Sequence, residues 1–322
     1  MTELVSLTQH GAVAVITLNS PPVNALGVPV IDGIHQLIQR AHNDGATQAI
    51  VLIGSGRAFS GGADIREFGK PRPADKPTLP QLLDVMDAFN KPLVAAIHGV
   101  AMGGGLELAL ACDYRIASPG AQIALPEVKI GILPGAGGTQ RLPRAIGVEP
   151  ALAMITSGDP VLTEQAHKLG IVDEIATGDL LQAALAFTQK VIDEKRGTRK
   201  LSQLTARMPS GVSNVAEYFA AAKARIAKEK RGFPAPLACA ECVEAAVTLP
   251  FAQGIARERD LFLGLVKGTE SAALRYLFFA ERQAQKIPDV PEDTPTREIK
   301  SAAVIGAGTM GGGIAMNFAN AG

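Results

Sequence analysis

The sequence has few cysteines, no net charge and no long uninterrupted apolar run, and each absence excludes a class of protein. Its three cysteines are an odd number, which argues against a disulfide framework and for a reducing compartment. Cys239 and Cys242 form a C-x-x-C without a second pair or a nearby histidine. We therefore interpret them as small buried residues and expect no metal site.

The charge balance excludes further partners. Lysine and arginine total 31, as do aspartate and glutamate, so nothing indicates a nucleic acid or an anionic membrane surface as partner. The N-terminus carries an acid and no apolar core, which is unlike a signal peptide. The longest apolar run, 92–112, contains His98, Glu107 and several glycines, so we expect a soluble core and no membrane span.

What the sequence does contain is enough apolar material for a large domain with appendages, since 47% of its 322 residues are hydrophobic. The pattern predicts a hairpin of Leu4–Thr8 and Ala12–Leu18, a helix over Val28–His42 and a strand over Ala49–Ile53. This strand, strand, helix order repeats through the first 180 residues. It predicts an α/β fold built as a stacked spiral of such units.

Three glycines, 103–105, separate an apolar strand from a helix predicted over Leu106–Cys112. Glycines at a helix start leave N–H groups open to another molecule, where the helix dipole helps to stabilise an oxyanion. Glu107 lies three residues after Gly104, on the same side of that helix. It is either a helix-start charge that favours the dipole or a buried acid held for chemistry. The glycine cluster and a second glutamate favour the buried acid.

That second glutamate is Glu127, between a short predicted strand and a loop rich in glycine and proline. Alone, its Pro-Glu pair indicates an ordinary helix start. However, the segments AFSGGADI, HGVAMGGGLELALACDYRIA and PEVKIGILPGAGGTQRLPR occur here in a specific order and spacing. In them the chain resembles the enoyl-CoA hydratase/isomerase (crotonase) superfamily. From about Ala12 onward, it is similar to the N-terminal part of a multifunctional fatty-acid β-oxidation enzyme.

The resemblance implies a fold and a division into domains. It implies a crotonase (ClpP-like) spiral of ββα units, then a helical region, then the first strand and helix of a Rossmann domain. The expected ranges are a crotonase core over 1–195, its helical C-terminal part over 196–258, a linker helix over 259–286, a linker over 287–298, and the start of the Rossmann domain over 299–322. Periodicity within the linker region predicts one long helix over Leu261–Gln285.

The resemblance also assigns roles to residues. The N–H groups of Ala63 and Gly104 would form an oxyanion hole for a thioester oxygen. Glu107 would take the proton of the attacking water, and Glu127 would deliver a proton to C2. The loop around Asp64 otherwise reads as a glycine-rich turn into a helix capped by that residue. The expected substrate-binding residues are Gly62, Asp64, Arg66 for the CoA phosphates, Gly103, and Gly135 for the acyl pocket.

These roles imply hydration of 2-enoyl-CoA to 3-hydroxyacyl-CoA without a cofactor. Relatives limited to double-bond isomerisation can use one glutamate, so the pair favours a hydratase, with Δ3,Δ2 isomerisation through Glu127 as a second activity. Two alternatives stay open. One is another crotonase-fold reaction, namely isomerisation alone, thioester hydrolysis or decarboxylation. The other is a non-catalytic fragment that binds CoA esters.

A second motif lies at the end of the sequence. Gly306, Gly308 and Gly311 form a G-x-G-x-x-G between a predicted strand and a predicted helix, which indicates a dinucleotide-binding Rossmann start. The family has an NAD-dependent 3-hydroxyacyl-CoA dehydrogenase domain here. The acidic residue expected about 20 positions later is absent, so we expect a truncated chain that binds NAD poorly.

The resemblance further implies partners and a compartment. The expected partners are an acyl-CoA thioester, the dehydrogenase domain of the same parent chain and, as a further candidate, a thiolase subunit. The expected location is the cytoplasm of a bacterium, with a peroxisome as the alternative.

Overall fold

The computed structural model describes residues 3–68, 70, 72–291 and 294–321. These residues divide into two units, one that ends at Phe278 and one that begins at Phe279, and each is considered by itself. The strands are β1 (Val5–His10), β2 (Val13–Leu18), β3 (Ala49–Gly54), β4 (Leu93–Ile97), β5 (Val100–Met102), β6 (Tyr114–Ala117), β7 (Gln122–Ala124), β8 (Val161–Leu162) and β9 (Glu174–Ile175).

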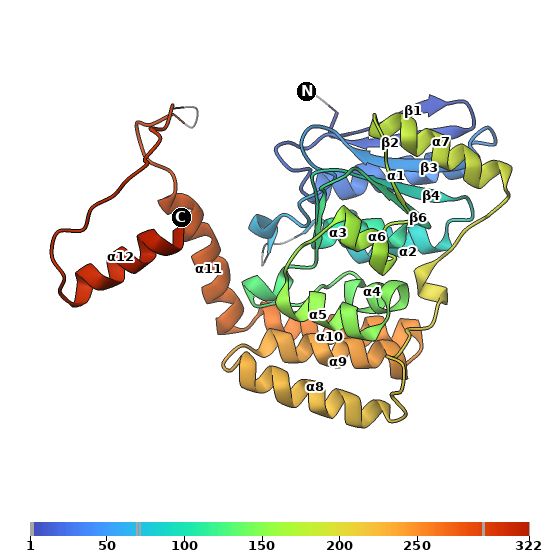
Figure 1. Cartoon of the computed structure of the whole chain (residues 1–322). Coiled ribbons are helices and arrows are strands. Elements are labelled where there is room, and N and C mark those ends of the chain that lie inside the picture. The colour runs from blue at the N-terminus through green and yellow to red at the C-terminus, as the bar shows by residue number, and fades with distance from the viewer. Residues whose placement is uncertain (1–2, 69, 71, 292–293, 322) are drawn as a thin grey trace. The chain divides into compact units, whose positions relative to one another are not determined.

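Helices cover these strands and form a layer of their own in the first unit (Figure 1). The helices of the first unit are α1 (Val28–Asn43), α2 (Leu79–Ala88), α3 (Gly104–Ala111), α4 (Gly138–Ile146), α5 (Val148–Ser157), α6 (Thr163–Leu169), α7 (Leu180–Asp193), α8 (Val215–Glu229), α9 (Pro234–Thr248) and α10 (Phe251–Val266). The helix α11 (Thr269–Ala284) runs across the boundary between the two units, and α12 (Thr309–Ala321) belongs to the second.

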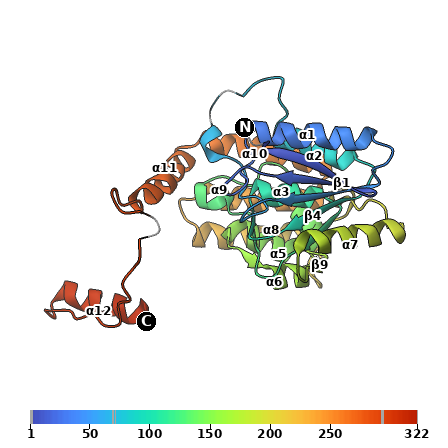
Figure 2. The same cartoon turned by 90° about the horizontal axis from the view of Figure 1, so that it is seen from above.

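The larger sheet has six strands in the order β1-β2-β3-β4-β6-β9. The predicted hairpin is confirmed as β1 and β2, which pair antiparallel, while the other neighbours pair parallel. Val13 and Val15 pack in the cluster beneath α7, whereas Ala14 and Ile16 pack in the cluster that includes the buried face of α1. Figure 2 shows α1 and α7 on opposite sides of the strands. Burial on both faces explains why these strands are apolar almost throughout.

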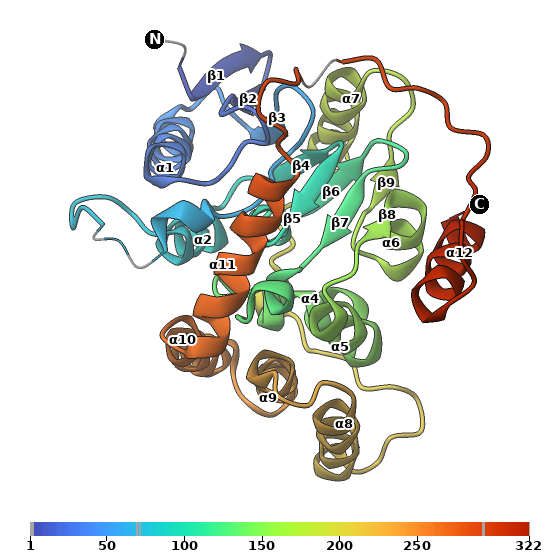
Figure 3. The same cartoon turned by 90° about the vertical axis from the view of Figure 1, so that its left-hand side faces the viewer.

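A smaller sheet in the order β5-β7-β8 lies next to the larger one (Figure 3). Along the chain, β4 is followed by β5, and β6 by β7, so each passage contributes one strand to each sheet. β8 and β9, with α6 between them, complete the third passage. The predicted spiral of strand, strand, helix units is therefore confirmed.

The helices α8, α9 and α10 pack beneath α4 and α5 (Figure 1). The core of this layer is α9, whose buried residues are mostly alanine and cysteine, which lets its neighbours approach closely. Cys239 and Cys242 are free and buried there, as predicted. This layer brings α10 beneath the beginning of α4.

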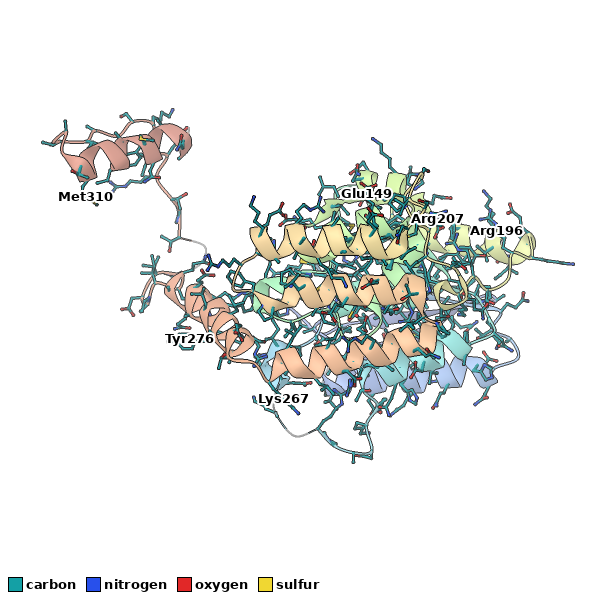
Figure 4. The ribbon with its side chains drawn as sticks, turned by 90° about the horizontal axis from the view of Figure 1, so that it is seen from below. Glu149, Arg196, Arg207, Lys267, Tyr276 and Met310 are labelled. Carbon is teal, nitrogen blue, oxygen red and sulfur yellow. The ribbon has the colours of Figure 1, made fainter. Side chains whose placement is uncertain are left out.

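The single helix predicted over Leu261–Gln285 is wrong. The structure ends α10 at Val266, just before Lys267, which Figure 4 labels, and α11 begins at Thr269. The intervening Gly268 is a weak helix former. Beyond it, the Ser271 hydroxyl donates to the Ile130 carbonyl at 3.2 Å, a contact that holds the first turn of α11 against the 3₁₀ helix at Glu127–Ile130.

The strand predicted ahead of Gly306 is also wrong, because residues 299–305 form no strand in the part of the second unit that is described. The predicted helix does form, as α12. A β-strand needs a neighbouring strand for its backbone N–H and C=O groups, whereas a helix satisfies most of its own. The α12 segment has such internal hydrogen bonds, and residues 299–305 have no adjacent described strand to pair with.

Candidate active site

The glycines between β5 and α3 have the conformation that the sequence required. Gly103 has φ +53° and ψ −127°, which strongly disfavours a residue with a side chain. A Cβ there would also lie 3.0 Å from Glu127 Oε1. Gly104 then begins α3, where N–H groups lack partners within the helix. The Glu127 carboxyl thus lies beside the entrance of α3.

The segment 60–63 runs alongside β5 and is fixed to it by backbone hydrogen bonds. The Ser60 N–H donates to Val100 O at 3.1 Å, and the Met102 N–H donates to Ser60 O at 3.0 Å. This pairing brings Ala63 N to 3.3 Å from the point where Gly104 would carry a Cβ. Neither the Ala63 N–H nor the Gly104 N–H donates to a described residue. The two predicted oxyanion donors therefore lie side by side and are open.

Glu107 is buried in the first turn of α3, with 3% of its surface exposed. Its Oε1 accepts hydrogen bonds from the Ala136 N–H at 2.7 Å and the Gly138 N–H at 2.8 Å. Burial raises the pKa of Glu107, while these two N–H groups and the nearby Arg141 charge act to lower it. Of the two interpretations from the sequence, the structure therefore shows the buried acid. The two hydrogen bonds fix the orientation of its carboxyl group.

Glu127 begins a short 3₁₀ helix, Glu127–Ile130, and is 9% exposed. Its Oε2 is buried and accepts no hydrogen bond from any described residue. Burial, and then the charge of Glu107, raise the pKa of Glu127 well above its ordinary value. Two interacting carboxyls lose their protons in coupled steps, so one stays protonated where the other is ionised. The pair thus offers one proton donor and one proton acceptor at the same pH.

A third carboxyl, Glu258 on α10, was not predicted. It is 1% exposed, and its Oε1 accepts from the Gly137 N–H at 2.6 Å. Its Oε2 accepts from the Thr139 N–H at 3.1 Å and contacts the Thr139 hydroxyl. Burial, and then Glu107, raise the pKa of Glu258 to about 8. Glu258 lies four residues before Phe262, on the same face of α10, and this spacing could have indicated that it is buried. Its charged neighbours in the sequence RERD instead suggested an exposed helix surface.

The predicted acyl-pocket residue Gly135 lies against Phe262 of α10. A Cβ on Gly135 would come within 2.6 Å of that ring, so the close approach requires glycine. The Phe262 ring meets the Phe68 ring edge-on at 6.5 Å. An apolar wall therefore lies next to the Gly135–Thr139 segment. Neither phenylalanine was predicted from the sequence, because aromatic side chains are ordinary core residues.

Asp64 and Arg66, predicted to bind substrate, bind each other. Asp64 caps the 3₁₀ turn Ile65–Glu67 through the Arg66 N–H, as its sequence position suggested. Both Asp64 oxygens also accept from the Arg66 guanidinium, at 2.7–3.2 Å. The Arg66 side chain remains 73% exposed and could reach a phosphate. The position of Gly62 has no room for a side chain, because a Cβ there would lie 2.5 Å from Met102 O.

The other predicted glycine motif lies in the second unit. Gly306 has φ +106°, and a Cβ on Gly311 would come within 1.9 Å of Gly306 O. Gly306 therefore forms a tight turn ahead of α12 and packs against Gly311 in the first turn of that helix, as the motif predicts, while Gly308 has open space around it.

Within the described ranges, no group of three histidine, cysteine or acidic side chains is arranged to hold a metal ion. None of the helices from α1 to α12 is both long and apolar enough to cross a membrane.

Comparisons with known proteins identify the family that the chain resembles. The sequence pattern of a family described as "Enoyl-CoA hydratase/isomerase" matches residues 8–231. The chain is 47% identical over 315 residues to a peroxisomal bifunctional enzyme of Danio rerio, covering 97% of this chain and 43% of that protein. It is 36% identical over 314 residues to a peroxisomal fatty acid beta-oxidation multifunctional protein of Arabidopsis thaliana, covering 95% of this chain and 43% of that protein. The chain thus spans less than half the length of these relatives.

Among solved structures, the fold is similar to that of an enoyl-CoA hydratase from Mycobacterium avium subsp. paratuberculosis. The TM-score is 0.60 at 26% identity, and the match covers 86% of this chain and 96% of that one.

Proposed function

The chain belongs to the enoyl-CoA hydratase/isomerase family, and we propose that it adds water to 2-enoyl-CoA thioesters to give 3-hydroxyacyl-CoA. One observation carries the proposal: the buried Glu127 carboxyl lies against Gly103, at the entrance of α3 where the N–H groups of Ala63 and Gly104 are open, and burial and the charge of the buried Glu107 raise its pKa. Such an arrangement can hold a thioester, stabilise its oxyanion and move two protons.

In the proposed reaction, the thioester oxygen lies between the N–H groups of Ala63 and Gly104. Water adds to C3, and negative charge moves onto that oxygen, where the two donors stabilise it. Glu107 takes the proton of the water, and Glu127 delivers a proton to C2. The fixed orientation of Glu107 suits a base, and the raised pKa of Glu127 suits a proton donor near neutral pH.

Δ3,Δ2-enoyl-CoA isomerisation is the second candidate function, and a specific observation favours it. Glu127 Oε2 is buried and has no described hydrogen-bond donor, so it is available to carry a proton from one carbon to another. The same oxyanion donors would stabilise the dienolate formed between the two steps. In this reaction Glu107 is a bystander, so the two activities depend differently on the two glutamates.

Further roles extend the proposal to substrate and partners. Gly62, Gly103 and Gly135 would shape the thioester and acyl subsites, and Arg66, with its partner Asp64, would bind the CoA phosphates. The exposed guanidinium of Arg66 supports the latter. Hydration itself needs no cofactor.

The second unit suggests what else the whole protein contains. Gly306, Gly308 and Gly311 would begin an NAD-dependent 3-hydroxyacyl-CoA dehydrogenase domain of the same protein, a role supported by the tight turn at Gly306 and Gly311. A thiolase subunit is a further candidate partner. We propose that the protein acts in a bacterial cytoplasm or in a peroxisome, and the similarity to peroxisomal proteins supports the peroxisome.

The test is hydration of crotonyl-CoA, followed by loss of the enoyl absorbance. Glu107→Gln and Glu127→Gln should each reduce kcat by about 10²–10⁴-fold, because each removes a proton-transfer group. Affinity for acetoacetyl-CoA should change little. The matched control is Glu149→Gln, which changes an exposed glutamate on α5, labelled in Figure 4, and should leave kcat unchanged.

The alternatives give different results in the same assays. Near-normal turnover in either active-site variant would refute the assignment. Binding of acetoacetyl-CoA without any turnover by the wild type would favour a non-catalytic CoA-ester-binding protein. Release of free CoA from an acyl-CoA would favour thioester hydrolysis, and loss of a substrate carboxyl group would favour decarboxylation.

A further inference from the structure

We propose that Glu258 is a positioning residue for the reaction: it fixes the turn Ala136–Thr139 and thereby aims Glu107 at the water. This inference rests on the proposed hydratase function and deepens it. It gives a catalytic purpose to α10, a helix of the layer outside the spiral.

The turn Ala136–Thr139 presents four successive backbone N–H groups, and two buried carboxyls share them alternately. Ala136 and Gly138 donate to Glu107 Oε1, at 2.7 and 2.8 Å. Gly137 and Thr139 donate to the two oxygens of Glu258, at 2.6 and 3.1 Å. Successive N–H groups in this turn thus point alternately to Glu107 and to Glu258. A shift of the two N–H groups that bind Glu258 would therefore also shift the two that bind Glu107.

Two further side chains also hold the turn. Arg141 donates to the Ala136 carbonyl at 3.0 Å and pairs with Asp87 of α2. The side chain of Gln140 donates to the Thr139 hydroxyl at 3.0 Å and to the Cys242 carbonyl of α9 at 2.8 Å. Arg141 thus links the turn to α2, and Gln140 links it to α9, which makes the turn a rigid support for Glu107.

Glu258 is suited to hold the turn in either protonation state. As a carboxylate, it accepts from both N–H groups and from the Thr139 hydroxyl. When protonated, it can donate to that hydroxyl and still accept from both N–H groups. Its role is therefore geometric and does not require that Glu258 exchange protons with the substrate.

Position matters because Glu107 has to accept a proton from the water while that water faces C3 of the substrate. Displacement of a catalytic group by about 1 Å can reduce the rate by about 10²-fold. If Glu258 no longer holds Gly137 and Thr139, the turn loses two of its N–H contacts, and the two N–H groups that orient Glu107 are free to shift. Substrate binding depends on other groups, so the loss should appear in kcat.

The experiment compares Glu258→Gln with the wild type in crotonyl-CoA hydration. Glutamine has the same size, but its amide group can accept only one of the two N–H groups and opposes the other. We expect kcat to fall by about 10- to 100-fold while KM changes less than about threefold. The matched control is Asp260→Asn, which removes an exposed acid from the same helix and should leave kcat unchanged.

A second pair of variants keeps the test informative if Glu258→Gln does not fold. Thr139→Ala removes the hydroxyl next to Glu258, and Thr139→Ser keeps it. The inference expects a reduced kcat for the first and restoration by the second, at unchanged KM.

Three results would count against it. A folded Glu258→Gln with kcat within twofold of the wild type overturns the inference, as does a change confined to KM. Equal activities of the Thr139→Ala variant and the wild type would also overturn it. Absence of hydration by the wild type would instead refute the proposed function.

Discussion

Helices α3 and α12 both begin at glycine-rich turns, and they differ completely in their surroundings. All eight residues of α3 are buried, whereas α12 has no buried residue. Both turns place a glycine at positive φ just before the helix, at Gly103 and at Gly306. Only the turn before α3 has carboxyls around it. The comparison shows that a glycine motif supplies open N–H groups, while the groups that use them come from other segments.

The difference between the two turns can be tested most directly by adding a methyl group to each of them. Gly103→Ala should reduce crotonyl-CoA hydration by about 10²–10³-fold, because the Cβ meets Glu127 Oε1 and the positive φ disfavours alanine. Gly308→Ala, in open space ahead of α12, should leave hydration unchanged. Initial rates of both variants check this. Equal rates for the two variants would mean that the α3 entrance does not form the site.

The buried acids near α3 should also give the first unit a pH-dependent stability. The pKa of Glu258 is about 8, against an ordinary 4.5, so the folded protein binds this proton more tightly than the unfolded chain. The resulting stabilisation is complete below about pH 4.5 and is lost as the pH rises through about 8. Relative to Glu258→Gln, the free energy of unfolding of the wild type should fall by roughly a few kcal/mol between about pH 5 and 8.

Urea unfolding of both proteins at these two pH values is the measurement. Asp260→Asn serves as the control. Because Asp260 is exposed, the free energy of unfolding of this variant should match that of the wild type at both pH values. A wild type that gains stability over Glu258→Gln as the pH rises would show that the sign is wrong.

The smallest effect is expected at the other helix. Residues 299–305 form no strand in the described part of the second unit, and α12 buries no side chain, so the Gly306–Gly311 turn lacks a rigid support. We expect millimolar NAD to leave the melting temperature unchanged, since a ligand stabilises only as far as its concentration exceeds its Kd. Tight binding in calorimetry would show that the turn and helix suffice for the cofactor.

The local part of the structure could be read from the sequence. The predicted hairpin, the strand β3 and the helices α1 and α3 all form close to their predicted bounds. Their signals lie within a few residues: alternating or helical periodicity, and glycines where φ is positive. The roles of Glu107 and Glu127 came instead from a family resemblance that specific motifs carried.

Reasoning from local pattern failed where the outcome depends on distant partners. The helix predicted over Leu261–Gln285 is interrupted at Gly268, and the segment before Gly306 pairs with no strand among the residues that the structure describes. The same limit hid Glu258, which reads locally as one more charge on a helix. Its partners, Gly137 and Thr139, are about 120 positions away in the chain.

The sequence by itself determined which segments become helices and strands of the spiral, and where backbone N–H groups would be left open. Those outcomes depend on side-chain periodicity and on backbone freedom at single residues. Only the tertiary structure decided that three acids from α3, the 3₁₀ turn at Glu127 and α10 are buried around one region. The pKa of a carboxyl is set by the water removed from it and by the charges and donors close in space, and neither follows from its neighbours in the chain.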